Sequence, residues 1–330
     1  MEPWLILVIL LLLIGLHYMG NIMQEKLIRP YLLNNSEAEE GFENQESIAG
    51  SYPESKGIIR WLDNEELYDS FYASIYDQLC QGSVRTQAEV GLVLHEWTKR
   101  GDDLKDFSVL DAGCGTGIAP VSFAKMNVKK VVGLDKSEAM INQAKTKTLS
   151  QTTLTDEQKE KVEWRRGDLM NPSAAAGGEF THATMLYFTV YYLPDKETVF
   201  RNMFFWVKPG GKMAVHVVNK HKFDPMLESS SPWIGFSLQK YSDSRITRSE
   251  VAFNKFKYTG EFDLHDPSAE FRETMRFDNG SVRRQRHTFR MEDMTEIVGM
   301  ATAAGWKYTG HVDLTVIQFE YAFLLFFTHP

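Results

Sequence analysis

Three glycines at alternate positions restrict the fold of this chain more than any other feature of its sequence. Gly113, Gly115 and Gly117 follow the short apolar segment Phe107–Asp111 and precede a helical pattern over Ile118–Met126. Glycine lets a backbone adopt positive φ and pass close to a ligand. Open α/β sheets bind ligands at the carboxyl ends of their strands, beside helix N-termini. The loop therefore predicts a ligand site at the edge of a parallel sheet.

Strand and helix patterns alternate around this loop. Further strands are expected at 130–134, 162–165, 180–186 and 213–218, and helices at 84–99, from Ser137 onward and at 194–207. Such alternation is typical of βαβ units, which place helices on both faces of a parallel sheet. Two final strands, expected at 306–313 and 316–327, would end it as an antiparallel hairpin. We therefore predict an α/β fold with a doubly wound, mainly parallel seven-stranded sheet.

The pattern changes after residue 219. Three successive strands are expected at 251–264, 269–277 and 281–290, and Asp278-Asn279-Gly280 is typical of a hairpin turn between the last two. We predict that residues 219–290 are an insertion after the fifth strand, an antiparallel and irregular cover over the substrate site.

The first two dozen residues are strongly apolar. No charged side chain occurs between Glu2 and Glu25, and about twenty helical residues reach roughly 30 Å, the thickness of the hydrocarbon core of a membrane. We interpret segment 1–24, with its core at residues 4–23, as a transmembrane anchor. A cleaved signal peptide and a buried helix are the alternatives. A signal peptide would carry positive charge before the run and a small-residue cleavage site after it, and neither is evident.

The segment after the apolar run predicts how the chain is oriented. Lys26 and Arg29 follow the run, so the positive-inside rule favours a single-pass membrane protein with its C-terminal domain in the cytosol. Residues 25–56 are rich in glutamate, and we interpret them as an acidic tether, with a charged surface helix as the alternative. Residues 57–330 would form one globular domain.

Composition excludes several classes of protein. Lys and Arg number 36 against 44 Asp and Glu, a formal charge of −8. This acidic balance argues against a nucleic-acid partner, which would call for a basic surface. The two cysteines, Cys80 and Cys114, are too few for a disulfide framework or a cysteine metal site, so no metal is predicted.

The spacing of the glycine loop separates two kinds of cofactor. A dinucleotide-binding loop reads G-x-G-x-x-G, whereas Ile118 occupies the sixth position counted from Gly113. The glycines follow G-x-G-x-G instead, with Asp111 two residues before the first. An acid at that position suits a cofactor that carries an ammonium group better than one that presents a pyrophosphate. A nicotinamide-dependent oxidoreductase is therefore disfavoured.

This loop resembles the Asp-x-Gly-x-Gly-x-Gly loop of the class I S-adenosylmethionine-dependent methyltransferases. The resemblance covers about residues 68–330. Trp206–Gly211 matches the family's turn before its fifth strand, and Tyr68–Asp77 resembles the aromatic segment that covers the cofactor. The resemblance implies a Rossmann-like methyltransferase fold, methyltransferase activity and S-adenosyl-L-methionine as the cofactor.

The resemblance also implies roles for single residues. Asp135 would accept hydrogen bonds from the two ribose hydroxyls, Met140 would pack on the adenine and Asp168 would meet the adenine amino group. Each has a purely structural alternative, as a helix cap, a core residue and a turn residue respectively. The full set of expected cofactor-binding residues is Tyr76, Asp111, Gly113, Cys114, Gly115, Gly117, Asp135, Lys136, Met140, Asp168, Leu169 and Tyr187.

The transfer step itself leaves few signals in the sequence. A sulfonium methyl group is already activated, so the main task is to hold the acceptor in line with it, with a base where a proton must leave. Candidates after the fourth strand are Tyr187, Tyr191 and Tyr192, which we interpret mainly as pocket-shaping rings. His221 is the better candidate base after the fifth strand, while His216 is interpreted as a core histidine. No catalytic residue is assigned.

Aromatic residues in and beside the expected insertion indicate the class of acceptor. Trp233, Phe236, Tyr241 and Phe253 would suit an apolar or planar acceptor, so we expect a small or lipid-like molecule methylated at a membrane surface. A protein acceptor and a catalytically inactive membrane-bound scaffold are the alternatives. Basic residues 283–290 are interpreted as a solvated or ion-paired strand rather than a site for anionic lipid. Oligomeric state is not predicted.

Overall fold

The protein is described from a computed structural model, which covers residues 60–80, 82–148, 150, 154–225, 246–253, 256–317 and 319–330. The expected anchor 1–24 and tether 25–56 lie outside the described residues, as do Trp233, Phe236 and Tyr241. Among the helices of the described residues, none combines the length and the apolar character needed to cross a membrane. The domain boundaries drawn from the sequence stay predictions.

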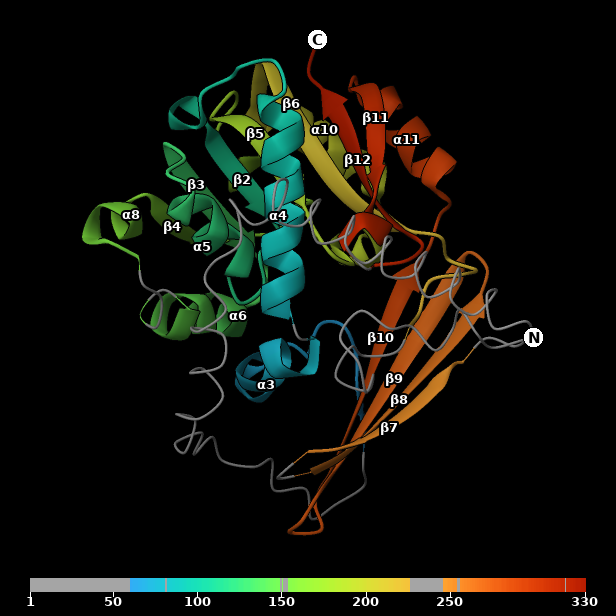
Figure 1. The fold of residues 1–330 in the computed structure, drawn as a ribbon. Coiled ribbons are helices and arrows are strands. Elements are labelled where there is room, and N and C mark those ends of the chain that lie inside the picture. The colour runs from blue at the N-terminus through green and yellow to red at the C-terminus, as the bar shows by residue number, and fades with distance from the viewer. Residues whose placement is uncertain are drawn as a thin grey trace, which may run out of the picture.

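A seven-stranded sheet forms the centre of the molecule (Figure 1), with strand order β11-β12-β6-β5-β2-β3-β4. Its strands are β2 (Ser108–Ala112), β3 (Lys130–Asp135), β4 (Val162–Arg166), β5 (Phe180–Met185), β6 (Val207–Val218), β11 (Lys307–Asp313) and β12 (Ala322–Thr328). Strands β2 to β6 pair in parallel, whereas β12 runs antiparallel to both of its neighbours. The predicted mainly parallel sheet with a terminal antiparallel hairpin is confirmed.

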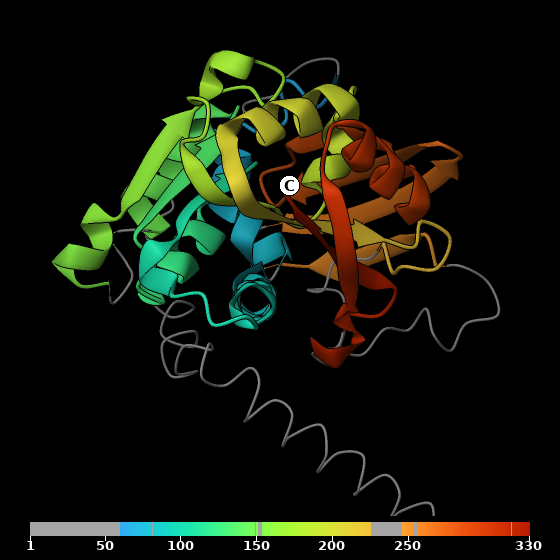
Figure 2. The same cartoon turned by 90° about the horizontal axis from the view of Figure 1, so that it is seen from above.

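Helices cover both faces of this sheet (Figure 2). Helices α4 (Gly82–Thr98), α5 (Ile118–Lys125) and α6 (Glu138–Gln143) lie on one face, and α10 (Lys196–Trp206) and α11 (Met294–Ala303) on the other. Helix α3 (Ser70–Cys80) precedes α4 in the chain. Short helical segments are α8 (Asp156–Glu160), α9 (Thr189–Tyr192), the π-helical turn Ala144–Thr148, and the 3₁₀ turns Leu104–Asp106, Pro172–Ala174 and Leu314–Ile317. The sheet is therefore doubly wound, as predicted.

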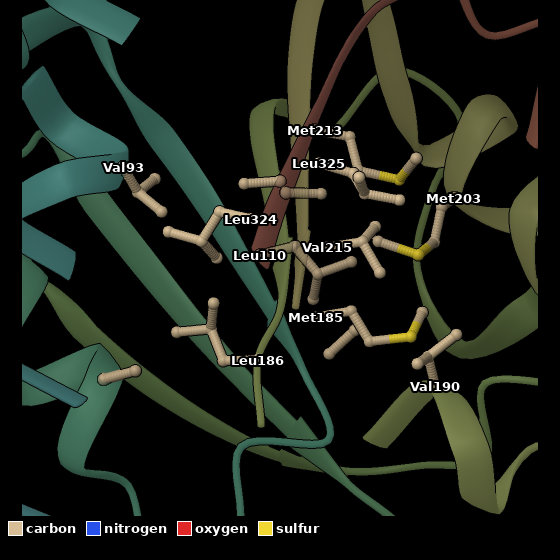
Figure 3. Packing of buried hydrophobic residues seen from close by; sticks show 14 of the residues in the cluster. Val93, Leu110, Met185, Leu186, Val190, Met203, Met213, Val215, Leu324 and Leu325 are labelled. Carbon is tan, nitrogen blue, oxygen red and sulfur yellow. The ribbon is translucent and has the colours of Figure 1, made fainter. Parts of the chain in front are cut away.

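The main core lies on the two faces of the central strands (Figure 3). Val93 of α4 packs on one side of the sheet and Met203 of α10 on the other, and both are fully buried. Leu110 and Val215 come from β2 and β6 between them. Strands covered on both faces read as continuous apolar runs rather than as alternating ones. This explains why short apolar segments located these strands in the sequence.

A second sheet, with order β1-β10-β9-β8-β7, stands beside the first (Figure 1, where β7 to β10 are orange). Its strands are β1 (Trp61–Leu62), β7 (Arg248–Ala252), β8 (Phe256–His265), β9 (Ser268–Phe277) and β10 (Val282–Arg290). Strands β7 to β10 pair antiparallel in succession. The expected turn joins β9 to β10, with Gly280 at φ 83°. The predicted antiparallel insertion is thus present.

Four segments differ from expectation. The strand expected over 316–327 begins only at Ala322, because Thr315 donates through its N–H and its hydroxyl to Asp313, a turn that starts the 3₁₀ segment. The turn expected at 208–211 lies within β6. The strand expected from residue 251 is split into β7 and β8, and β1, which pairs in parallel with β10, was not predicted.

The basic residues of β10 alternate between its faces as the sequence indicated. Arg283 and His287 are buried, whereas Arg284, Arg286 and Arg290 lie on the opposite face. Arg286 pairs with Asp63 at 2.9 Å. These contacts favour the interpretation of an ion-paired strand.

Candidate functional site

A cavity of about 790 Å³ opens at the carboxyl ends of β2, β3 and β5. Helix α3 and the residues before it border the same space, and Thr116 of the glycine loop donates to Asp77 of α3 at 2.5 Å. Its lining includes Asn64, Tyr68, Tyr76, Arg85, Asp111, Gly113, Cys114, Gly115, Asp135, Lys136, Met140, Asp168, Leu169, Tyr187, Phe188 and Tyr192. This is the edge at which open α/β sheets bind ligands.

The glycine loop forms one wall of the cavity and has the backbone that its sequence requires. Gly113, Gly115 and Gly117 have φ of 75°, 53° and 89°, in the region that side chains disfavour. A Cβ on Gly113 would meet Thr189 at 2.4 Å, and one on Gly117 would meet Trp164 at 2.2 Å. A Cβ on Gly115 would meet no atom within 4 Å. The loop therefore leaves open space next to Gly115.

Asp135 ends β3 and holds the glycine loop. Its carboxylate accepts hydrogen bonds from the backbone N–H of Gly115 at 2.9 Å and of Ser137 at 2.8 Å. Ser137 is the residue that caps α6, because its hydroxyl accepts from the N–H of Met140. Burial raises the pKa of the Asp135 carboxyl, and these backbone groups oppose the rise. Each oxygen keeps lone pairs that a ligand hydroxyl can use.

Asp111 lies deeper, at 2% exposure, on β2. Its carboxyl accepts a hydrogen bond from the Thr184 hydroxyl at 2.8 Å. Burial raises the pKa of Asp111 to about 7, and the charges of Asp135 and Glu89 raise it further, against the Thr184 bond. In the described part of the chain no Lys or Arg pairs with this carboxyl. A buried acid of this kind is suited to a cationic ligand.

The other expected binding residues also surround the cavity, with one exception. Met140 is buried beside Tyr72 and Ile75 of α3, and Leu169 is 7% exposed. Lys136 pairs with Glu65 at 2.7 Å and lies 3.8 Å from Asp168. The exception is Gly117, which lies under the loop against Trp164. Burial raises the pKa of the Cys114 thiol, so this residue is expected to act through its backbone.

The three catalytic candidates separate in space. Tyr187 lines the cavity in a left-handed conformation, φ 53°, with the Arg85 guanidinium 3.8 Å from its ring centre. Tyr191 is buried, and its hydroxyl accepts from the N–H of Val218 at 2.8 Å. His221 lies on an exposed turn, 4.0 Å from Asp266. Neither Tyr191 nor His221 belongs to the cavity lining.

Two features of the site were missed in the sequence. Arg85 of α4 is 5% exposed, and Glu89 one turn later contacts His216 at 3.0 Å, which makes His216 a partnered core histidine as interpreted. Glu273 and His287 form a buried polar cluster behind Tyr192. Glu273 and His287 lie at inward-facing positions of their strands. A charged or titratable residue at an inward position of an alternating strand is the signal that would have identified them.

Residues 109–211 match a family model described as a methyltransferase domain. A solved S-adenosylmethionine-dependent methyltransferase from Clostridium acetobutylicum superposes with a TM-score of 0.59 at 16% identity, over 78% of this chain and 97% of that one. Residues 109–211 are thus similar to a methyltransferase domain, and the chain has the fold of a known S-adenosylmethionine-dependent methyltransferase. The sequence resemblance is thereby confirmed at the level of the domain and its fold, and S-adenosylmethionine is the cofactor of that family.

Curated relatives of the methyltransferase domain act on small molecules, according to their names. Phosphoethanolamine N-methyltransferase 1 of Triticum aestivum is 30% identical over 171 residues, which are 49% of this chain and 30% of that protein. Magnesium-protoporphyrin O-methyltransferase of Rhodobacter capsulatus is 35% identical over 95 residues, 28% of this chain and 38% of that protein. The chain thus spans less than half the length of these relatives.

Proposed function

We propose that the protein transfers a methyl group from S-adenosylmethionine to a small-molecule acceptor. The observation that carries this proposal is the pair Asp111 and Asp135 on one ligand-sized cavity beside the glycine loop. Sites for small molecules typically enclose 300–1,000 Å³, and this cavity lies in that range. The matched family model begins at residue 109 and includes both acids.

The residues of the cavity fit this cofactor. The Asp111 carboxyl, buried without a basic partner in the described chain, suits the ammonium group of a methionine moiety. Asp135 offers two oxygens to the neighbouring hydroxyls of a ribose. The open space at Gly115 accepts a ligand where any side chain would obstruct it. Met140 and Leu169 supply apolar surface for an adenine ring.

Bound S-adenosylmethionine supplies a methyl group already activated by its sulfonium sulfur. The protein's own contribution is to orient the acceptor and exclude water, and such positioning is worth up to roughly 7–11 kcal/mol of barrier. Tyr68, Tyr76 and Tyr192 bring aromatic surface to the acceptor side of the cavity. Arg85, whose guanidinium lies 3.8 Å from the centre of the Tyr187 ring, holds this ring of the loop after β5 in place.

We extend the proposal to a membrane surface. The uncharged run at residues 4–23 would anchor the protein in a single pass, the tether would span 25–56, and the methyltransferase domain would face the cytosol because Lys26 and Arg29 follow the run. A lipid-like acceptor would then meet the cavity without leaving the membrane region. Extraction of membranes with alkaline carbonate tests this part, since an anchored protein stays in the pellet.

Labelling of a cell extract tests the reaction. The full-length protein is incubated with the extract and with cofactor that carries a labelled methyl group, and lipid, metabolite and protein fractions are separated. We expect the label in the lipid or metabolite fraction. Label found in protein alone would reject the small-molecule acceptor, and cofactor binding without any transfer would favour an inactive scaffold.

A further inference from the structure

A chain of hydrogen bonds leads from the cavity into the second sheet. The hydroxyl of Tyr192, a cavity residue at the end of α9, lies 2.6 Å from Nδ1 of His287 on β10. Nε2 of His287 lies 2.6 Å from Oε2 of Glu273 on β9. His287 is 3% exposed and Glu273 is fully buried. Three side chains from three elements are thus in line, and only Tyr192 reaches the cavity.

Glu273 is surrounded by donors. Its carboxylate accepts from the hydroxyls of Tyr72 at 2.9 Å and Tyr258 at 2.6 Å, and from the amide of Gln285. Burial alone raises the pKa of Glu273, but the positive charge of His287 when it is protonated, and the hydrogen bonds from His287, Tyr258 and Gln285 in either state, outweigh burial and hold this pKa below its usual value. Nε of Arg283 donates to the side-chain oxygen Oε1 of Gln285 at 2.7 Å, which orients the side-chain amide nitrogen toward Glu273. The carboxylate is therefore charged and fixed.

A charged Glu273 determines which nitrogen of His287 carries the proton. A carboxylate only accepts hydrogen bonds, so Nε2 must donate to it. In the neutral imidazole Nδ1 then has a free lone pair, and the Tyr192 hydroxyl donates to it. Tyr68, which also lines the cavity, packs edge-on against Tyr192, with the ring centroids 5.9 Å apart. His287 is thus poised to receive a proton that comes from the cavity.

We propose that Tyr192, His287 and Glu273 are a proton relay for the methyl transfer, an inference that rests on the function proposed above. Tyr192 is the catalytic residue that touches the acceptor, and His287 and Glu273 act through it. The arrangement follows the logic of a nucleophile, a base and an orienting carboxylate. It implies an acceptor that loses a proton on methylation, namely an amine or a hydroxyl compound.

The transfer balances as follows. The acceptor atom forms a bond to the methyl carbon while the carbon–sulfur bond breaks and its electron pair stays on sulfur. The acceptor's proton passes to the Tyr192 oxygen as the Tyr192 proton passes to Nδ1 of His287. The positive charge of the sulfonium is replaced by that of the imidazolium, beside Glu273. The proton returns to solvent after the product leaves.

The groups that surround His287 belong to the buried cluster and the cavity wall. The titratable groups that face it are Tyr68 and Tyr72 before and within α3, Tyr192 of α9 and Glu273 of β9. Burial holds the pKa of each of these three tyrosines well above 10. Arg284 and Arg286 on its own strand lie on the opposite face. His287 is therefore the base that the Tyr192 hydroxyl contacts directly.

Variants of the full-length protein test the relay. Tyr192→Phe and His287→Gln should each slow label transfer by about 100-fold or more, the usual contribution of acid–base catalysis, while calorimetry with S-adenosylhomocysteine gives an affinity within about twofold of the parent. In His287→Gln the lost rate should partly recover as pH rises, because the acceptor then loses its proton to water. Tyr191→Phe is the matched control, since in the described part of the chain its hydroxyl bonds to the backbone of Val218, outside the cavity.

The outcomes separate the relay from the function on which it rests. A parent protein that binds no S-adenosylhomocysteine and transfers no label rejects the proposed function. A parent that transfers label while Tyr192→Phe and His287→Gln behave like Tyr191→Phe rejects the relay alone. Nitrogen-15 spectra of His287 provide a readout independent of turnover, and a proton on Nδ1 rather than Nε2 at neutral pH would also overturn it.

Discussion

Asp111 is a carboxyl group whose charge depends on what the cavity contains. Its pKa is raised to about 7, chiefly by burial, whereas an exposed aspartate in an unfolded chain titrates near 3.9. The folded protein therefore holds a proton between about pH 4 and pH 7 that the unfolded chain has lost. A cationic ligand reverses this preference, because it stabilises the ionised carboxylate.

Asp111→Asn should make the ligand-free protein more stable at pH 8. The raised pKa of Asp111 stabilises the folded protein below about pH 4, and this stabilisation is lost as the pH rises through about 7. The loss amounts to a few kcal/mol. Asparagine does not ionise, so the variant does not lose this stability. Denaturant titrations at pH 4 and pH 8 measure it, with the exposed Asp106→Asn as control. The same variant should bind S-adenosylhomocysteine more weakly. Equal stability of the two proteins at pH 8 would contradict the charge argument.

Asp135→Ala should weaken the binding of S-adenosylhomocysteine severely while the fold is retained. Two hydrogen bonds to a charged group are lost, each worth about 1.5–3 kcal/mol, and the N–H of Gly115 loses its partner. Calorimetry should show a loss of roughly 100-fold or more, with Asp168→Ala at the more open rim showing a smaller one. Unchanged affinity would overturn the assignment of Asp135 to the ribose.

At the scale of elements, the glycine loop joins β2 to α5 through backbone conformation alone. Its three residues need positive φ, and its N–H groups at Gly113 and Cys114 donate to Leu134 of β3. The loop is thus fixed to the neighbouring strand before any ligand binds. The relay, by contrast, depends on side chains from three separate elements, because α9 contacts β10 and β10 contacts β9.

Comparing Gly115→Ala with Gly101→Ala separates two effects of an added methyl group: the loss of stability caused by the left-handed backbone and the loss of space for a ligand. An alanine in the left-handed region costs about 1–2 kcal/mol, and Gly101 at φ 86° shares both this conformation and open surroundings, away from the cavity. Both Gly115→Ala and Gly101→Ala should therefore lower the free energy of unfolding similarly. Only Gly115→Ala should weaken S-adenosylhomocysteine binding in calorimetry. Equal affinities in the two variants would remove Gly115 from the cofactor site.

At the scale of the whole molecule, the methyltransferase domain combines two sheets with different tasks. The parallel sheet presents Asp111 and Asp135 at its carboxyl edge, and the antiparallel sheet supplies Glu273 and His287 from behind. In the proposed mechanism, the side of the cavity that holds the cofactor and the side that accepts the proton thus come from separate parts of the chain. The segment before residue 60 enters this picture only as a prediction from sequence.

Deletion of residues 1–30 should release a soluble protein that still binds S-adenosylhomocysteine. The cavity lining begins at Asn64, and an uncharged run of this length is expected to hold the protein in membranes rather than to build the site. Ultracentrifugation of lysates, followed by calorimetry on the soluble fraction, tests both parts. An aggregated product that binds no ligand would assign the run to the core.

Features whose interacting residues are close in sequence could be predicted, whereas features that join residues far apart in sequence could not. The parallel sheet and the glycine loop were predicted because each signal lies within a few consecutive residues, as in Gly113–Gly117. The breakdown of the strand expected at 316–327 depends on one side chain, Asp313, that bonds locally. Strand β1 escaped prediction because Trp61 pairs with Arg284, more than two hundred positions later.

The sequence by itself determined the fold class, the glycine loop and the acids that face it, because parallel strands in βαβ units bring the ends of consecutive elements to one edge. Only the tertiary structure decided which tyrosine faces a base. Tyr191 and Tyr192 are adjacent in sequence, yet one bonds to Val218 and the other to His287, 95 positions away. Strand register and helix rotation set that choice, and both are fixed by packing across the whole domain rather than by neighbouring residues.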